Sequence, residues 1–312
     1  AASGTGSILL DATTNLSLVG SIDTVTGSIT LLAGQNLAAG TTSTITSSGG
    51  DALLQTGGSS MQLGGTIDLG GGTLRIVVLG GEGNVHGTIA GSGGLSKQGI
   101  GELTLDSSGV FVYSGLTSVQ GGTLVVNGTL AGDVTISSGG KLTGNGSIAG
   151  GVTALAGAVL SPGDGTGVLH VGELVLQPGA TLEVELHGIV PGSQYDQIVV
   201  AGSVQFAGAT LVVQGGQVSF PKGSSVVFIV NDGANAAFGS LVDANQRVLT
   251  QGSEFLFGGT SANVVYDAGS PANDVGLLFE RQTTVFFFTD LGPNRDTNAD
   301  SETIADSASS AR

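Results

Sequence analysis

Two neighbouring stretches, GGTLVVNGTLAGDVT (121–135) and GGKLTGNGSIAGGVT (139–153), share one pattern of glycines, leucines and Asn-Gly turns. Leu124 in the first stretch corresponds to Leu142 in the second, 18 residues later, and Leu160 continues the series at the same step. A fixed period of about 20 residues is the sequence signature of a repeat protein. The fold therefore depends on the secondary structure that one such repeat unit forms.

Within a unit, apolar residues alternate with polar ones and a glycine-rich turn follows. Leu182, Val184 and Leu186 are an example. Alternation with period two is typical of a half-buried β-strand. Two or three short strands cannot close a sheet by themselves, but each can pair with its equivalent in the next unit. We therefore predict an all-β fold, a parallel β-helix over residues 1 to about 190.

In such a β-helix the repeated leucines enter a continuous interior column, because period two fixes which side chains point inward. We expect Leu124, Leu142 and Leu160 to stack one above another, and helix to be nearly absent. The 57 glycines agree with a chain that turns many corners.

The composition of the chain limits the classes of molecule that it is expected to bind and the chemistry that it can perform. Lys and Arg number 8 against 24 Asp and Glu, which gives a net charge of −16 and disfavours nucleic acid and anionic lipid. No stretch approaches the 18 or so consecutive apolar residues of a transmembrane helix. The absence of cysteine excludes disulfides, thiolate nucleophiles and Cys-ligated metals.

The run GELTLDSSGVFVYSGLTSVQGGTLVVNGTL (101–130) resembles the autotransporter-associated β-strand repeat of bacterial passenger domains, and residues 158–188 resemble the segment that follows it. YDQIVVAGSVQFAGATLVV (195–213) resembles the end of such passengers. The resemblance implies a right-handed β-helix exported from a Gram-negative-type cell to its surface. No outer-membrane barrel follows in this sequence, so the chain is expected to be a processed passenger or a surface protein secreted by another route.

The 18-residue sequence repeat becomes irregular after residue 190. We expect residues 191–289 to form a looser β-helix continuation or a capping β region, and residues 290–312 an acidic flexible tail. TTVFFF (283–288) is a strongly β-prone run, and Val285, Phe286, Phe287 and Phe288 are the predicted self-association residues. The alternative is that these phenylalanines fold back to close the core of their own chain. GSILLDATTNLSLV (6–19) has one charge and no proline, so it is a poorly defended strand edge.

Glu183, Glu185 and His187 alternate with inward residues and are expected to share one outward face. Two carboxylates at i and i+2 lie roughly 7 Å apart along a strand, within the range that inverting glycosidases use. Any outward strand face with two glutamates has this spacing, and a solvated face is the favoured interpretation.

A β-helix polysaccharide lyase would need a basic residue beside carboxylates that hold Ca²⁺. No cation of this sequence falls in an obvious Asp cluster, so scattered surface charge is the favoured interpretation for Arg75, Lys97, Lys141, Lys222, Arg247, Arg281 and Arg295. His86 and His170 are isolated in the sequence, and no Ser/His/Asp triad is predicted.

Asp296, Asn298 and Asp300 have the 1, 3, 5 spacing of a Ca²⁺ loop, but Ser301 replaces the sixth-position glycine. A solvated acidic tail is favoured, and no cofactor is predicted beyond this weak Ca²⁺ candidate.

The sequence thus predicts an extracellular structural or adhesive surface module that associates with itself, as an oligomer or filament, with glycans or host-cell molecules as further partners. The alternative is a polysaccharide-active β-helix enzyme, a lyase or glycoside hydrolase.

Overall fold

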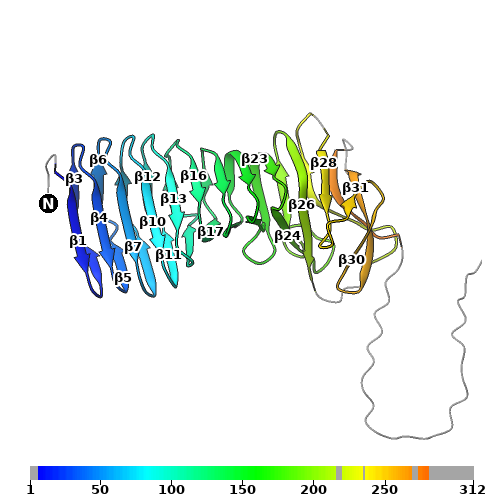
Figure 1. Ribbon diagram of the computed structural model, residues 1–312, viewed down its shortest axis with the longest axis horizontal. Coiled ribbons are helices and arrows are strands. Elements are labelled where there is room, and N and C mark those ends of the chain that lie inside the picture. Colours follow the sequence, from blue (N-terminus) through cyan, green and yellow to red (C-terminus); the bar gives the residue numbers. More distant parts are fainter. Residues whose placement is uncertain (1–5, 216–219, 235, 269–272, 281–312) are drawn as a thin grey trace, which may run out of the picture.

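The chain winds around one long axis, from β1 at the N-terminal end to a differently built region at the other (Figure 1). The computed structural model describes residues 6–215, 220–234, 236–268 and 273–280. These residues form strands and turns and no helix, which confirms the predicted all-β parallel β-helix with a C-terminal capping region.

The strands stack in parallel ladders that form the sides of the solenoid. The first ladder contains β1 (Ile8–Ala12), β4 (Ile29–Ala33), β7 (Ala52–Thr56), β10 (Leu74–Val78), β13 (Leu95–Gln98), β16 (Thr117–Val119) and β19 (Val134–Ile136). The second contains β2 (Leu16–Leu18), β5 (Asn36–Ala39), β8 (Ser60–Leu63), β11 (Glu82–Val85), β14 (Glu102–Leu105), β17 (Gly122–Val126), β20 (Gly140–Thr143), β22 (Val159–Leu160) and β24 (Thr181–Glu185).

A third side contains β3 (Ser21–Thr24), β6 (Thr44–Ser47), β9 (Thr66–Asp68), β12 (Thr88–Ala90), β15 (Val110–Phe111), β18 (Thr129–Leu130), β25 (Gln197–Val200) and β27 (Ser225–Asn231). Three longer strands run around a corner and join two sides each: β21 (Ser147–Ala154), β23 (Val168–Leu176) and β26 (Val204–Gln214).

The interior is a column of aliphatic side chains, as predicted. Leu124 pairs with Leu142 and Leu142 with Leu160 in successive coils, and all three are fully buried. The column continues through Leu103 on one side and Leu182 on the other. Because these contacts join neighbouring coils only, each coil is stabilised by the one before and the one after it.

Glycine is required where the chain turns a corner beneath the preceding coil. Gly144 has φ +123°, and a Cβ built on it would lie 2.1 Å from the carbonyl oxygen of Val126. No side chain fits there without moving the backbone. The corner therefore sets the close stacking of β20 on β17.

Parallel stacking gives way to antiparallel pairing at the C-terminal end. β28 (Phe238–Val242) pairs with β29 (Val248–Leu249), and β30 (Glu254–Phe257), β31 (Thr260–Ala268) and β32 (Asp274–Leu278) form an antiparallel group that joins β27. The ring of Phe220 stacks on that of Phe279 with centroids 4.0 Å apart. This end of the apolar column is closed by aromatic side chains.

Candidate functional site

The predicted polar face exists on the outer side of β24. Leu182, Val184 and Leu186 are buried, whereas Glu183 and Glu185 are partly exposed. Glu183 forms an ion pair with Lys141 of β20, and the Nζ and Oε2 atoms are 2.8 Å apart. Both side chains keep access to water, so this pair contributes no more than about 1 kcal/mol to stability.

His187 continues this face and is exposed. Its Nε2 lies 3.7 Å from Oε2 of Glu185. The structure therefore brings together the three residues that the sequence placed on one face, and adds Lys141 to them.

A buried carboxylate that sequence reasoning missed lies behind this face. Asp196 is fully buried; Oδ1 accepts the N–H of Gly167 at 2.9 Å and Oδ2 accepts the N–H of Glu185 at 2.7 Å. Burial raises the pKa of Asp196 to about 7, although the two N–H donors favour the ionised form. Asp196 thus ties residues 161–167, which follow β22, to the strand that carries Glu183 and Glu185.

Residues 161–167 form one wall of a cavity of about 230 Å³ on this side of the solenoid. Carboxylates from three separate elements line it, Glu102 of β14, Asp164 and Glu185. Burial raises the pKa of Glu102 above its ordinary value, and the negative charge of Asp164 adds to the rise. The ammonium group of Lys141 and the hydroxyls of Thr123, Thr143 and Ser161 complete the lining. This lining includes no aromatic side chain.

The expectation of scattered surface charge is wrong for Lys97. This residue is fully buried, and its Nζ donates to the carbonyl oxygens of Gln98, Gly99 and Gly121 at 3.1, 3.0 and 2.9 Å. Burial lowers the pKa of Lys97 to about 8, and the charge of Glu102 opposes that change. These hydrogen bonds connect a corner of the coil that contains Lys97 to the following coil.

The alignment of successive coils in the sequence could have predicted that the side chain of Lys97 points inward. Lys97 pairs with Ile76 in the coil before and with Val119 in the coil after, and both are buried. A lysine in register with two inward aliphatic residues is an inward lysine.

The other cations are on the surface where the structure describes them. Arg75 points outward as predicted, and Lys222 is exposed. Arg247 forms an ion pair with Asp243, with Nε and Oδ2 2.9 Å apart. Arg281 and Arg295 lie outside the described residues, and so do Asp296, Asn298 and Asp300. In the part of the chain that the structure describes, no group of three or more acidic or histidine side chains is placed to hold a metal ion.

In the part of the chain that the structure describes, the first strand of the N-terminal coil is paired on one edge only. β1 pairs with β4 on one side and has no partner among the described residues on the other. Leu9 is 63% exposed and Leu10 37% exposed, and Ile8 is only partly buried against the core. The only charge in residues 6–19 is Asp11. The other predicted association residues, Val285, Phe286, Phe287 and Phe288, lie outside the described residues.

Comparison of the sequence with protein-family models and with curated proteins finds no match. Among the described residues, no helical segment has the length and hydropathy that a membrane crossing requires. The β-solenoid is a fold consistent with a structural or adhesive module, and its polar face and N-terminal edge are the features from which a function is argued.

Proposed function

We propose that this protein is an extracellular structural or adhesive module, a β-solenoid rod of the autotransporter-passenger kind that associates with other copies of itself on a Gram-negative-type cell surface. The observation that carries the proposal is the difference between the two ends of the rod. The C-terminal end has antiparallel strands and stacked aromatic rings, whereas β1 at the N-terminal end exposes leucines and has one edge without a strand partner among the described residues. An undefended strand edge is a template for pairing with another chain.

The geometry of β1 fits a second copy. Ile8, Leu10 and Ala12 are in register with the inward residues of β4, so they mark the inward face of the strand. Two β1 strands that pair antiparallel about Leu10 place Ile8 opposite Ala12 and keep both apolar faces on one side. The same register puts Asp11 opposite Leu9 rather than opposite a second Asp11, so like charges are not brought together.

A lysine at the edge tests the proposal. Leu10→Lys places a charge on the inward face of the edge strand, which natural sheets use to block pairing. Ile100→Lys is the matched control, because Ile100 is 85% exposed at a corner between β13 and β14. Size-exclusion chromatography at rising protein concentration should show assembly of the intact protein and of the control, and a monomer for Leu10→Lys with an unchanged circular dichroism spectrum. A monomeric intact protein at every concentration would remove self-association from the proposal.

A second candidate function is favoured by the cavity beside β14. Glu102 and Glu185 line it together, and a pair of carboxylates is the machinery of glycoside hydrolysis. The raised pKa of Glu102 suits a general acid. Release of reducing ends from a neutral polysaccharide, abolished by Glu102→Gln and by Glu185→Gln, would establish the enzyme in place of the structural module.

A further inference from the structure

The last parallel coil of the rod meets the antiparallel C-terminal region at a short segment, residues 231–233. β27 ends at Asn231, and the chain then continues through Asp232 and Gly233. β32 begins at Asp274, directly after Asn273, and runs antiparallel to β27. Several side-chain oxygen atoms are brought together at this junction.

The preceding coil holds the 231–233 segment from one side. Asp232 donates its backbone N–H to the carbonyl oxygen of Val200, at 2.8 Å. A Cβ built on Gly233 would clash with the carbonyl oxygen of Gly202, so only glycine allows the two coils to come this close. The segment is therefore fixed against the coil next to it.

Asn273 and Asp274 contact the same segment. Nδ2 of Asn273 donates to the carbonyl oxygen of Gly233 at 2.9 Å, and Oδ1 of Asp274 accepts the N–H of Asn231 at 2.8 Å. Asn273 is 6% exposed and Asp274 is 9% exposed. Both side chains thus reach the three residues that include Asp232, so the amide of Asn273 lies close to two carboxylates.

One oxygen atom at this junction has no partner. Oδ1 of Asn273 is buried, and no hydrogen bond reaches it among the described residues. Exchanging the oxygen and nitrogen of the amide does not solve this, because the oxygen would then face the carbonyl oxygen of Gly233. A buried carbonyl oxygen in this state is costly and requires a partner that the chain itself does not supply.

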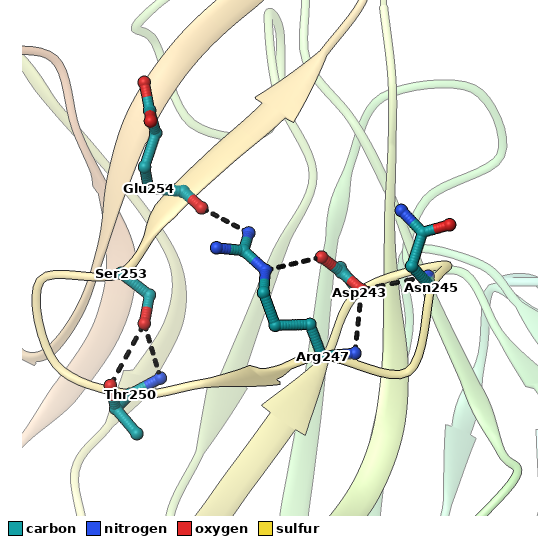
Figure 2. Close-up of polar contacts among 6 residues, drawn as sticks. All are labelled: Asp243, Asn245, Arg247, Thr250, Ser253 and Glu254. Atoms are coloured by element: carbon teal, nitrogen blue, oxygen red, sulfur yellow. Dashed lines mark hydrogen bonds and ion pairs between the residues drawn. The ribbon is translucent and has the colours of Figure 1, made fainter.

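The two carboxylates also lack a cation. Neither Asp232 nor Asp274 forms an ion pair with a Lys or Arg in the described part of the chain. Asp243, in the loop after β28, differs in this respect, because its carboxylate accepts a hydrogen bond from Nε of Arg247 at 2.9 Å (Figure 2). Burial raises the pKa of Asp274, the N–H of Asn231 opposes that rise, and the negative charge of Asp232 adds to it.

We propose that a calcium ion binds at this junction, coordinated by Oδ1 of Asn273 and by the carboxylates of Asp232 and Asp274. Carboxylate and amide oxygens, completed by water, are the ligands that Ca²⁺ takes in proteins. Asp274 has Oδ2 for the ion, since Oδ1 accepts the N–H of Asn231. The site has two carboxylates and an amide, so it differs from a cluster of three or more acidic side chains, which the described residues do not form.

The ion connects the two parts of the fold. Asp232 follows β27, the last parallel coil, whereas Asn273 and Asp274 stand at the start of β32. With two carboxylates and water as the remaining ligands, the dissociation constant should lie in the weak range of about 10⁻⁴ to 10⁻³ M. The site is at the opposite end of the rod from β1, and the proposal is independent of self-association.

Equilibrium dialysis of the full chain against calcium, after removal of metal with EDTA, tests the site. The intact protein should bind one ion per chain. Asp232→Asn and Asp274→Asn should each weaken binding by at least about tenfold, because even a change outside the ligand shell costs about 10- to 100-fold in metal affinity. Both substitutions preserve side-chain size, and the amide introduced by Asp274→Asn can still accept the N–H of Asn231.

Two controls separate this site from other acidic groups. Asp51→Asn removes the same charge from a carboxylate that also accepts a backbone N–H, that of Thr73 at 2.7 Å, and should bind calcium as the intact protein does. The double variant Asp296→Asn/Asp300→Asn removes the weak Ca²⁺ candidate of the sequence and should also bind normally. The proposal is overturned by an intact protein that binds no calcium at millimolar concentration. Unchanged binding in Asp232→Asn or Asp274→Asn, or loss of the ion in the double variant, also overturns it.

Hydrogen exchange gives a second measurement. The amide of Asn231 should exchange more slowly in calcium than in EDTA, because the ion stabilises the closed arrangement in which Asp274 accepts this N–H. Magnesium at the same concentration should have a smaller effect, since Mg²⁺ gives up its water reluctantly. The amide of Leu124, in the middle of the rod, should be unaffected. Exchange at Asn231 that does not respond to calcium overturns the proposal.

Discussion

The ammonium nitrogen of Lys97 lies 2.9 Å from the carbonyl oxygen of Gly121, across the boundary between two successive coils. The lysine is fully buried in an otherwise aliphatic row between Ile76 and Val119. A charge in such a row is costly unless its donors are all used, and three carbonyl groups use them here. Lys97 therefore forms a buried set of hydrogen bonds that links two coils within the apolar column.

This burial predicts a pH dependence of stability. The pKa of Lys97 is about 8 in the folded protein and about 10.4 when unfolded, so between these values the unfolded chain binds more protons. The free energy of unfolding should consequently rise as the pH is raised from 8 to 10. Lys97→Met should lack this rise, whereas Lys141→Met, which removes a partly exposed lysine, should retain it. Urea denaturation at each pH is the measurement, and parallel curves for the intact protein and Lys97→Met would contradict the assignment.

Asp196 predicts the opposite trend at lower pH. Its pKa is raised to about 7, so the folded protein binds more protons than the unfolded chain between about pH 4 and pH 7. The stabilisation associated with Asp196 is complete below pH 4 and is lost as the pH rises through 7. Asp196→Asn should flatten this part of the pH profile.

Asp196→Asn should also cost about 1 to 3 kcal/mol, because the amide turns an N–H toward a buried backbone N–H. Asp51→Asn is the control, since Asp51 accepts the N–H of Thr73 at an exposed corner and its replacement should cost less. Equal losses for the two variants, measured by denaturant unfolding, would show that burial of Asp196 has no special weight.

The leucine column predicts the effect of a cavity. Leu142→Ala removes a fully buried side chain between Leu124 and Leu160 and should destabilise the protein by about 2 to 5 kcal/mol. Leu155→Ala, at a position that is 39% exposed, should change stability by no more than about 0.5 kcal/mol. Hydrogen exchange should place the loss in the coils that contact residue 142. Equal effects of the two substitutions would contradict the stacked interior.

Substitutions of two glycines by alanine distinguish the cost of a steric clash from the cost of a positive φ. Gly139→Ala introduces a side chain at φ +80° with nothing within 4 Å, so conformational strain alone should cost about 1 to 2 kcal/mol. Gly144→Ala adds a clash with the carbonyl of Val126, and its cost should be clearly larger. Thermal unfolding of both variants checks the order, and the reverse order would contradict the corner packing described for β17 and β20.

The period of the sequence predicted the fold, and it did so through particular residues. Leu124, Leu142 and Leu160 stack because period-two alternation points them inward and the step of 18 residues brings them into register. The step is longer elsewhere: Leu103 pairs with Leu124, and Leu160 with Leu182. Such variation is absorbed at corners, where loop length is weakly constrained.

The site was less predictable because its contacts cross between coils. Asp196 receives its hydrogen bonds from Gly167 and Glu185, which the fold alone brings near it. Lys141 meets Glu183 across β22, and no local pattern connects a lysine with a glutamate 42 residues later. The outward face of Glu183, Glu185 and His187 was predictable, since alternation along one strand determines it.

The central claim is that the rod associates with a second copy through the edge of β1 that has no strand partner among the described residues. Small-angle X-ray scattering over a range of protein concentrations tests this claim most directly, because it measures particle length and cross-section separately. The account predicts that the maximum dimension grows to about twice that of a single rod while the radius of the cross-section stays constant, and that Leu10→Lys abolishes this growth. A single rod at all concentrations, or growth in cross-section at constant length, would contradict it.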